Sequence, residues 1–246
     1  MRRHVRASVR LLRLSTHIAV GLVTVLLRFP SLTAAQQSAR VQVWAGEMLR
    51  RIGVELQVRG TPPAHGPVLL VANHISWLDI LAMHAARHCR FVSKSDVKHW
   101  PLLGRLATAA GTLYIERASR RDALRVVHTM RESLLDGDVL AVFPEGTTSN
   151  GIALLPFHAN LLQAAISADA PVLPVGLRFI DRATGAHSQA ASYVGDETLT
   201  GSLWRTLCAE GLVAVVHYGT PQQAAGRDRR TWADDLRDAV DGLRRA

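Results

Sequence analysis

The chain is poor in cysteine: Cys89 and Cys208 are the only two in 246 residues. They lie far apart and form no Cys-x-x-Cys pattern, so the sequence predicts neither a disulfide framework nor a structural zinc site. His84 and His88 have the spacing of two ligands on one helix face, but such a pair is more often packed or solvated. We therefore expect no metal, and a reducing cytoplasm suits this cysteine usage.

Acidic residues and lysine are scarce as well. Lys and Arg total 29 against 20 Asp and Glu, which gives a formal net charge of +9, and the only lysines are Lys94 and Lys98. This surplus indicates an anionic partner, whether nucleic acid, anionic lipid or a phosphorylated substrate. Because the sequence contains no recognised nucleic-acid motif, we expect no nucleic-acid partner.

No apolar run reaches the roughly 20 residues that a membrane-spanning helix needs. An uncharged stretch at residues 14–27 follows a basic segment that runs from Arg2 to Arg13 without an acid. Basic residues before an apolar segment are typical of a cytoplasmic membrane surface. We expect a retained re-entrant or interfacial segment, and a signal peptide cleaved near residues 33–35 is the competing interpretation.

A second helical pattern runs from about Gln36 to Ile52, and Gly53 is the expected C-cap. With the first segment it predicts a helical hairpin on or in the bilayer, and the alternative is a helix packed on the globular core. We therefore divide the chain into residues 1–53, a basic N-terminus with membrane-associated helices, and residues 54–246, an α/β domain that carries the chemistry.

Beyond residue 53, short β-rich runs alternate with helical stretches, which is typical of an α/β domain. Several of these runs are continuously apolar and predict strands covered on both faces, so we expect one domain with a mixed, largely parallel sheet flanked by helices. Pro174 predicts an edge strand or a bulge. The expected strands are residues 54–58, 68–72, 90–93, 112–115, 139–143, 172–177 and 212–217, and the expected helices are residues 78–86, 121–135, 161–168 and 232–244.

The first motif, Asn-His-Ile-Ser-Trp-Leu-Asp at residues 73–79, lies between a buried strand and a helix. A five-residue step along a regular helix separates two side chains by about 140°, so His74 must precede the helix if it is to meet Asp79. Ser76 and Asp79 have the spacing of a capping box, which places Asp79 in the first turn. A histidine oriented by a carboxylate is a general base for a hydroxyl. The alternative is a capping acid beside an ordinary loop histidine.

The second motif, Phe-Pro-Glu-Gly-Thr-Thr-Ser at residues 143–149, directly follows an apolar strand. Loops at the carboxyl ends of such strands are where α/β proteins place ligands, and Gly146 lets a substrate approach the backbone closely. An ordinary turn is the alternative.

A third motif, Gly-Thr-Leu-Tyr-Ile-Glu-Arg, ends at Arg117, just after the expected strand at residues 112–115. Its guanidinium can bind a phosphate with two N–H groups or form a surface ion pair.

In this order the motifs resemble the glycerolipid acyltransferase family that includes 1-acylglycerol-3-phosphate acyltransferases. The resemblance extends over residues 68–177, and the His-x4-Asp and Phe-Pro-Glu-Gly-Thr motifs together are highly specific. It implies an N-terminal membrane motif of two helices. It also implies that His74 and Asp79 are catalytic, and that the acyl-acceptor site is shaped by Arg117, Glu145, Gly146 and Thr147.

Lys94 lies where family members often carry a basic residue near the acceptor phosphate, although a solvated lysine is the alternative. The sequence departs from the family pattern at two places. Thr148 replaces a common Arg, and Phe-His-Ala-Asn at residues 157–160 replaces a common Phe-Lys-x-Gly. These departures bear on the identity of the acceptor.

The resemblance implies direct acyl transfer from an acyl thioester (acyl-ACP or acyl-CoA) to a lysophospholipid, first 1-acylglycerol-3-phosphate, with no metal or bound cofactor. A lyso-aminolipid of the ornithine type is the alternative acceptor. We expect the protein at the inner (cytoplasmic) membrane, on an anionic surface, with its catalytic domain facing the cytoplasm. A serine hydrolase would need a Gly-x-Ser-x-Gly motif, which is absent. A non-catalytic basic membrane-binding protein would explain the charge but not the motifs.

Overall fold

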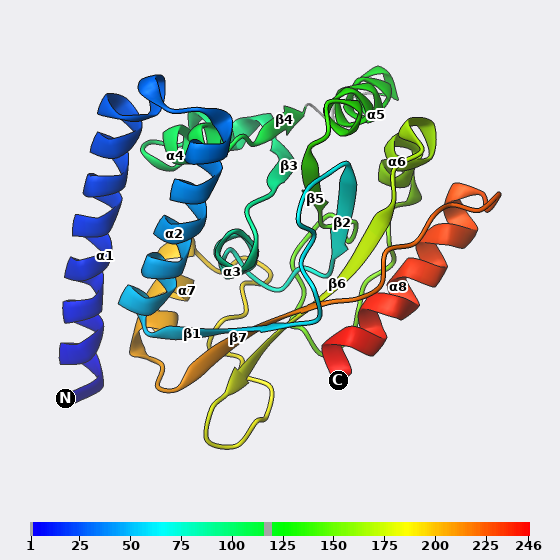
Figure 1. Cartoon of the computed structure of the whole chain (residues 1–246). Coiled ribbons are helices and arrows are strands. Elements are labelled where there is room, and N and C mark those ends of the chain that lie inside the picture. The colour runs from blue at the N-terminus through cyan, green and yellow to red at the C-terminus, as the bar shows by residue number, and fades with distance from the viewer. Residues whose placement is uncertain (1, 116–119) are drawn as a thin grey trace.

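The computed structural model describes residues 2–115 and 120–246. Within them lies a seven-stranded sheet in the order β1-β7-β6-β2-β5-β3-β4 (Figure 1). Its strands are β1 (Val54–Arg59), β2 (Val68–Ala72), β3 (Arg90–Lys94), β4 (Leu113–Ile115), β5 (Val139–Val142), β6 (Val172–Asp181) and β7 (Leu212–Tyr218). β6 and β7 are antiparallel, and the other neighbouring pairs are parallel. The predicted mixed, largely parallel sheet is therefore confirmed.

Helices cover both faces of the sheet. Among the described residues they are α1 (Arg2–Leu27), α2 (Ala34–Ile52), α3 (Leu78–Ala86), α4 (Leu103–Ala109), α5 (Arg120–Leu135), α6 (Leu162–Ala168), α7 (Leu199–Cys208) and α8 (Arg229–Arg245), with 3-10 turns η1 (Phe29–Ser31), η2 (Ser95–His99) and η3 (Ala159–Leu161). One core cluster joins Leu70 of β2 to α1, α2, α3 and α7, and the other joins its neighbour Leu69 to α5, α6 and α8. Successive residues of β2 thus face opposite layers, as a strand buried on both faces requires.

The first two helices form the expected hairpin. Thr33 and Gln36 make a capping box at the start of α2, and Gly53 ends that helix with a left-handed φ of 84°. His17 of α1 stacks on Trp44 of α2, with ring centroids 5.1 Å apart. The two helices therefore lie side by side.

α2 also packs on the globular core. Met48, Leu49 and Ile52 are at most 3% exposed and belong to the same cluster as the sheet and α3. α2 therefore pairs with α1 and also packs on the globular core, whereas the placement of this hairpin on or in the bilayer stays a prediction.

α1 is longer than its uncharged stretch suggested. The helix has 26 residues and is long and apolar enough to cross a membrane, with 17% of its apolar window buried. The expectation from residues 14–27 was too short because the helix continues back through the basic segment. Its outward side chains include Leu12, Val20, Val23 and Leu27, which are 53–73% exposed.

Part of the basic N-terminus is bound to protein. Arg6 donates to the carbonyl of Cys208 at 3.0 Å, and Arg10 donates to the carbonyls of Leu207 and Ala209 at 2.9 and 2.6 Å. These carbonyls end α7, where a cation complements the helix dipole. Two of the N-terminal arginines therefore fasten α1 to the domain.

Of the edge position or bulge predicted from Pro174, the edge position is wrong, whereas the pairing is irregular beside the proline: it stops at Val175 and Tyr218 and resumes at Val172 and Gln222, with one more residue on the partner side. Pro174 lies in β6, between β2 and β7, and its register partner on β2 is Val71. On the other side the β7 ladder ends at Val175 and Tyr218, and the carbonyl of Pro174 accepts from the Gly219 N–H at 2.9 Å. The backbone nitrogen and the carbonyl of one strand residue point to the same side of the strand. The nitrogen of Pro174, which carries no hydrogen, therefore points to the β7 side, just beyond the last regular pair of strands β6 and β7, where the loss of one hydrogen bond costs little.

Candidate active site

The two motifs meet at the carboxyl edge of the sheet. β2 and β5 are parallel neighbours in which Val71 lies opposite Val142. The segments that follow these strands, residues 73–79 and 143–149, therefore leave the sheet side by side. This is the edge at which open α/β sheets bind ligands.

His74 and Asp79 are in direct contact. His74 Nδ1 lies 2.8 Å from Asp79 Oδ2, and the side chains are 18% and 0% exposed. The same carboxylate oxygen accepts from the backbone N–H groups of Ile75 at 2.6 Å and Ser76 at 2.9 Å. The predicted geometry, with His74 before the helix and Asp79 in its first turn, is therefore present.

This geometry determines what the ring can do. An ionised carboxylate only accepts hydrogen bonds, so Nδ1 of His74 carries the hydrogen and Nε2 remains the basic nitrogen. No hydrogen bond occupies Nε2 within residues 2–115 and 120–246. A histidine in this state can take a proton from a hydroxyl, while the Asp79 carboxylate stabilises the resulting imidazolium.

The start of α3 differs in part from the predicted capping box. The helix begins at Leu78, and Ser76 Oγ accepts from the Leu78 N–H at 3.2 Å instead of from the Asp79 N–H. The other half of the box is present, because Asp79 accepts from the Ser76 N–H. The Asp79 N–H instead donates to the Ser76 carbonyl at 3.1 Å, which tightens this turn.

Glu145 connects the two loops through both carboxylate oxygens. Oε1 accepts from the His74 N–H at 2.7 Å, and Oε2 accepts from the Leu155 N–H at 2.9 Å. Glu145 is 3% exposed. Burial raises the pKa of its carboxyl group, and the bonds from Leu155 and His74 oppose that rise. The side chain thus holds the histidine loop, and its predicted contact with substrate stays a prediction.

The second motif also holds the carbonyl of His74. Ser149 donates to it through its N–H at 2.8 Å and its Oγ at 3.2 Å. Gly146 has a φ of 71°, and a Cβ at this position would lie 3.0 Å from the His158 ring, so the turn requires glycine. Gly146 and Thr147 are exposed, and a substrate can reach them at this edge.

The remaining predicted residues differ in how the structure places them. Lys94 is the last residue of β3 and is exposed. Thr148 is half-buried, and its hydroxyl donates to the carbonyl of Tyr193. Arg117 lies outside the described residues, so its role stays a prediction.

Two residues inside the first two motifs shape the site although the motif analysis assigned them no role. The Phe143 ring stacks on the His74 ring, with centroids 4.0 Å apart and planes inclined by 5°. Asn73 is 0% exposed, and its amide bonds the backbone N–H and carbonyl of Leu177 on β6 at 2.7 and 3.0 Å. The sequence signal that could have identified both residues was their position inside the two motifs.

The C-terminal helix supports the second loop. Arg244 donates to the carbonyls of Gly151 and Ile152 at 2.9 and 3.0 Å, and Arg237 donates to the carbonyl of Leu154 at 3.1 Å. Sequence reasoning missed this contact because the partners are more than 80 residues apart and carry no shared pattern.

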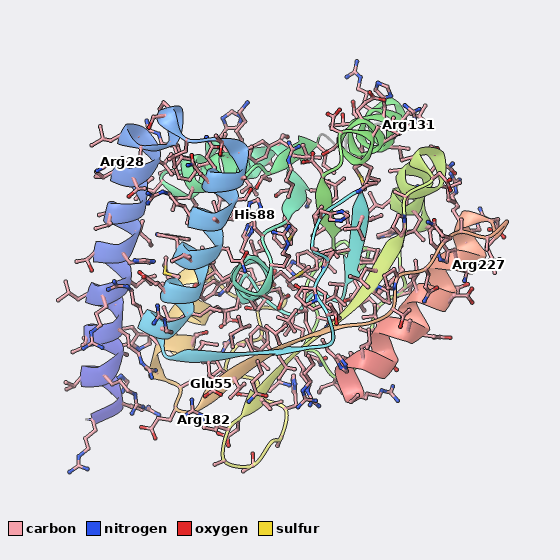
Figure 2. The ribbon with its side chains drawn as sticks, in the orientation of Figure 1. Arg28, Glu55, His88, Arg131, Arg182 and Arg227 are labelled. Carbon is pink, nitrogen blue, oxygen red and sulfur yellow. The ribbon has the colours of Figure 1, made fainter. Side chains whose placement is uncertain are left out.

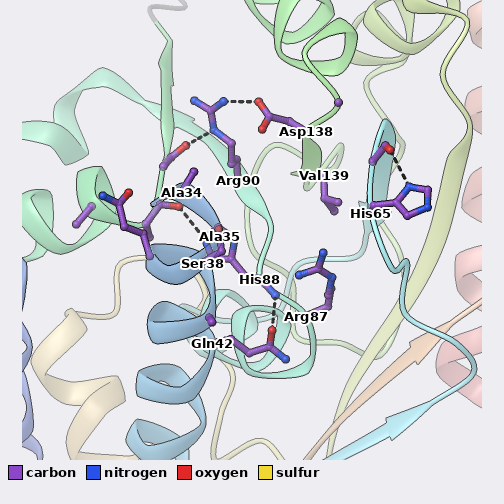
Figure 3. A pocket seen from close by; sticks show the side chains of 17 residues that line it. Ala34, Ala35, Ser38, Gln42, His65, Arg87, His88, Arg90, Asp138 and Val139 are labelled. Carbon is purple, nitrogen blue, oxygen red and sulfur yellow. Dashed lines mark hydrogen bonds and ion pairs between the residues drawn. The ribbon is translucent and has the colours of Figure 1, made fainter. Parts of the chain in front are cut away.

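A hollow of about 540 Å³ lies elsewhere, at the amino ends of β3 and β5 beside the start of α2 (Figure 3). Its basic groups already have protein partners: Arg87 donates to two backbone carbonyls, and Arg90 pairs with Asp138. His88, labelled in Figure 2, donates its N–H to Gln42 of α2 at 3.4 Å. The predicted site residues do not line this hollow, which is separate from the candidate active site.

Comparison with known proteins identifies the family. Residues 32–178 match the profile of the family described as Acyltransferase. A 1-acyl-sn-glycerol-3-phosphate acyltransferase of Neisseria gonorrhoeae is 39% identical over 78% of this chain and 75% of its own. A lyso-ornithine lipid O-acyltransferase of Pseudomonas aeruginosa is 36% identical over 80% of this chain and 75% of its own.

A crystal structure shares the fold. It is the 1-acyl-sn-glycerophosphate acyltransferase of Thermotoga maritima, which matches 98% of both chains with a TM-score of 0.66 and 17% identity. The family profile and the length of the sequence matches together show that this chain belongs to the acyltransferase family.

Proposed function

We propose that the protein transfers a fatty acyl group from an acyl thioester to the free hydroxyl of a lysophospholipid. The observation that carries this proposal is the contact between His74 and the buried Asp79, because an oriented histidine is the base that a hydroxyl nucleophile needs. The donor is acyl-ACP or acyl-CoA, in which the thioester carbonyl is the electrophile.

The reaction is a direct transfer. His74 Nε2 takes the hydroxyl proton as the acceptor oxygen attacks the thioester carbonyl carbon, and Asp79 stabilises the imidazolium by its charge. A new carbon–oxygen bond forms, the carbon–sulfur bond breaks, and the thiolate leaves with the proton from the imidazolium. This sequence needs no metal, bound cofactor or covalent enzyme intermediate.

The first candidate acceptor is 1-acylglycerol-3-phosphate, which would give phosphatidate. Arg117 and Lys94 supply cations for its phosphate, and Gly146 and Thr147 shape the loop beside His74. Glu145 takes part by holding the backbone of His74.

A lyso-ornithine lipid is the second candidate acceptor. Thr148 favours it, because a neutral hydroxyl that is bound to the Tyr193 carbonyl offers no charge to a phosphate. The relative from Pseudomonas aeruginosa is named for this activity.

Residues 1–53 attach the enzyme to the cytoplasmic face of the inner membrane, and residues 54–246 carry the catalytic groups. The apolar outward face of α1 supports attachment by insertion, and the remaining basic residues suit an anionic surface. This division is one of function, since α2 shares the core of the sheet.

The test is an assay of the purified protein in detergent, with a panel of lysolipids and with acyl-ACP and acyl-CoA donors. His74→Ala should abolish transfer while its unfolding curve and lysolipid binding stay those of the wild type. His128→Ala is the matched control, because that side chain is 73% exposed on α5. Full activity in a folded His74→Ala protein would refute the proposed mechanism. If the wild-type protein acylates no lysolipid of the panel, the proposed acceptors are wrong.

A further inference from the structure

The catalytic histidine lies face to face on an aromatic ring. The His74 and Phe143 rings are nearly parallel, inclined by 5°, with centroids 4.0 Å apart. Phe143 follows the last residue of β5, and the Phe91 ring stacks behind it at 5.5 Å with a tilt of 21°. Phe91 is 5% exposed, so the core fixes Phe143 from behind.

This stack favours one protonation state of the histidine. The face of a phenyl ring is electrically negative, so it attracts a positively charged ring more strongly than a neutral one. A cation within about 6 Å of the ring face is attracted to it, and the attraction grows where water is excluded. The contact therefore stabilises imidazolium more than neutral imidazole.

The other side of the site has the same preference. The carboxylate of Asp79 is buried, and its Oδ1 has no hydrogen-bond partner in the described part of the chain. Its charge is therefore compensated at Oδ2, which accepts from the backbone N–H groups of Ile75 and Ser76 and binds His74. Because a group that acts on the transition state must stabilise charge that develops there, both neighbours of the ring suit a base that becomes positive.

We propose that Phe143 is a positioning residue of the acyl transfer, whose ring face stabilises the imidazolium that His74 forms when it takes the hydroxyl proton. The inference rests on the proposed function of His74 as the base. It assigns to Phe143 an electrostatic role in addition to packing.

The variant that tests it is Phe143→Leu, which keeps an apolar side chain but removes the ring face. Base catalysis requires the neutral ring, so activity falls on the acidic side of the pH–rate profile. Without the stack the imidazolium is less stable, so the acidic limb of the kcat/KM profile should move to lower pH. Because the weaker base also reacts more slowly, kcat should fall about two- to fivefold.

A second measurement is independent of turnover. The ring NMR signals of His74, assigned by their loss in His74→Ala, should titrate at correspondingly lower pH in Phe143→Leu. Phe143→Tyr keeps a ring at the same place, so the acidic limb of its pH–rate profile and its NMR titration should stay at their wild-type pH. Phe143→Met fills a similar volume without a ring and repeats the test if the leucine variant does not fold.

Phe91→Leu is the matched control. It removes the same atoms from the same aromatic stack, one ring further from His74, and should leave the limb in place. A folded, active Phe143→Leu or Phe143→Met whose limb and NMR titration do not move overturns the inference, and so does an equal shift in Phe91→Leu. His74→Ala separates the two claims, because an active His74→Ala removes the proposed function itself.

Discussion

Glu145→Gln removes one hydrogen-bond acceptor from the centre of the candidate site. In the wild type, each oxygen of the buried carboxylate accepts one backbone N–H, from His74 at 2.7 Å and from Leu155 at 2.9 Å. Glutamine has a single acceptor oxygen, and its amide nitrogen is a donor. One of the two N–H groups therefore loses its acceptor and faces another donor.

The size of the effect follows from burial. An unpaired buried donor costs about 1–3 kcal/mol. Burial also raises the pKa of Glu145, so the wild type carries a desolvation cost that glutamine avoids. We expect a net loss of about 1–2 kcal/mol in the free energy of unfolding. Because a misplacement of about 1 Å can cost 10²-fold in rate, kcat should fall about 10- to 100-fold as the His74 loop relaxes.

The pH dependence gives a second signature. Since its pKa is raised by folding, Glu145 holds its proton to higher pH in the folded protein than in the unfolded chain. The wild type therefore loses stability as pH rises from the ordinary glutamate pKa through the raised value, and Glu145→Gln does not. The stability difference between the two proteins should be largest on the acidic side of this window and narrow above it.

Urea unfolding followed by tryptophan fluorescence measures the stability, and initial rates at varied acceptor concentration measure kcat and KM. Glu132→Gln is the control, because Glu132 is 52% exposed and its loss should change stability by less than about 0.5 kcal/mol. A glutamine variant with wild-type stability and a raised KM would mean that Glu145 contacts the acceptor, as the family resemblance implies. Unchanged stability and unchanged kinetics would refute both roles.

Thr148→Arg should raise the kcat/KM ratio of 1-acylglycerol-3-phosphate to lyso-ornithine lipid, since a guanidinium binds phosphate; an unchanged ratio in a folded, active variant would place acceptor choice elsewhere. Burial, with a contribution from His88, lowers the pKa of His84 to about 3, so the wild type should lose stability as pH falls below the ordinary histidine pKa, and urea unfolding should show a smaller loss in His84→Leu. Concentrated salt should leave the protein in the membrane pellet, because apolar insertion of α1 is not screened; release by salt alone would show electrostatic attachment.

The centre of the sheet could be predicted because β2 and β5 are continuous apolar runs. β2 is buried at all of its positions, and a sequence that has no polar alternation at residues 68–72 allows few other interpretations. The short helix α4 was missed, since it begins after Leu102 at a φ of 63° and without a side-chain cap. Pro174 misled only about the edge position, because a sequence does not reveal that β6 lies between β2 and β7.

The site was predictable where its chemistry is local in sequence. His74 and Asp79 are five residues apart, so helix geometry requires His74 to precede the helix if the two are to meet, and the spacing of Ser76 and Asp79 predicts that Asp79 lies in the first turn. The role of Glu145 could be recognised only in the structure, because its partners His74 and Leu155 come from different loops. Arg244 binds the carbonyl of Gly151, which is more than 90 residues away in the sequence. The sequence around Arg244 predicts only an ordinary charged helix, so this contact could not be predicted.

The parallel pairing of β2 and β5 brings the two motif loops of the candidate site together. Beyond the last paired residues, the backbone of His74 continues the contact between the two chains: its N–H binds Glu145 and its carbonyl binds Ser149. Gly146 and Thr147, exposed at the same edge, lie between those two residues in sequence. A substrate that contacts Gly146 or Thr147 therefore contacts the loop that holds the base at both of its backbone polar groups. Under the proposed function, acceptor binding and the position of the base His74 would therefore depend on one hydrogen-bonded unit, and a change that moves this loop should alter KM and kcat together.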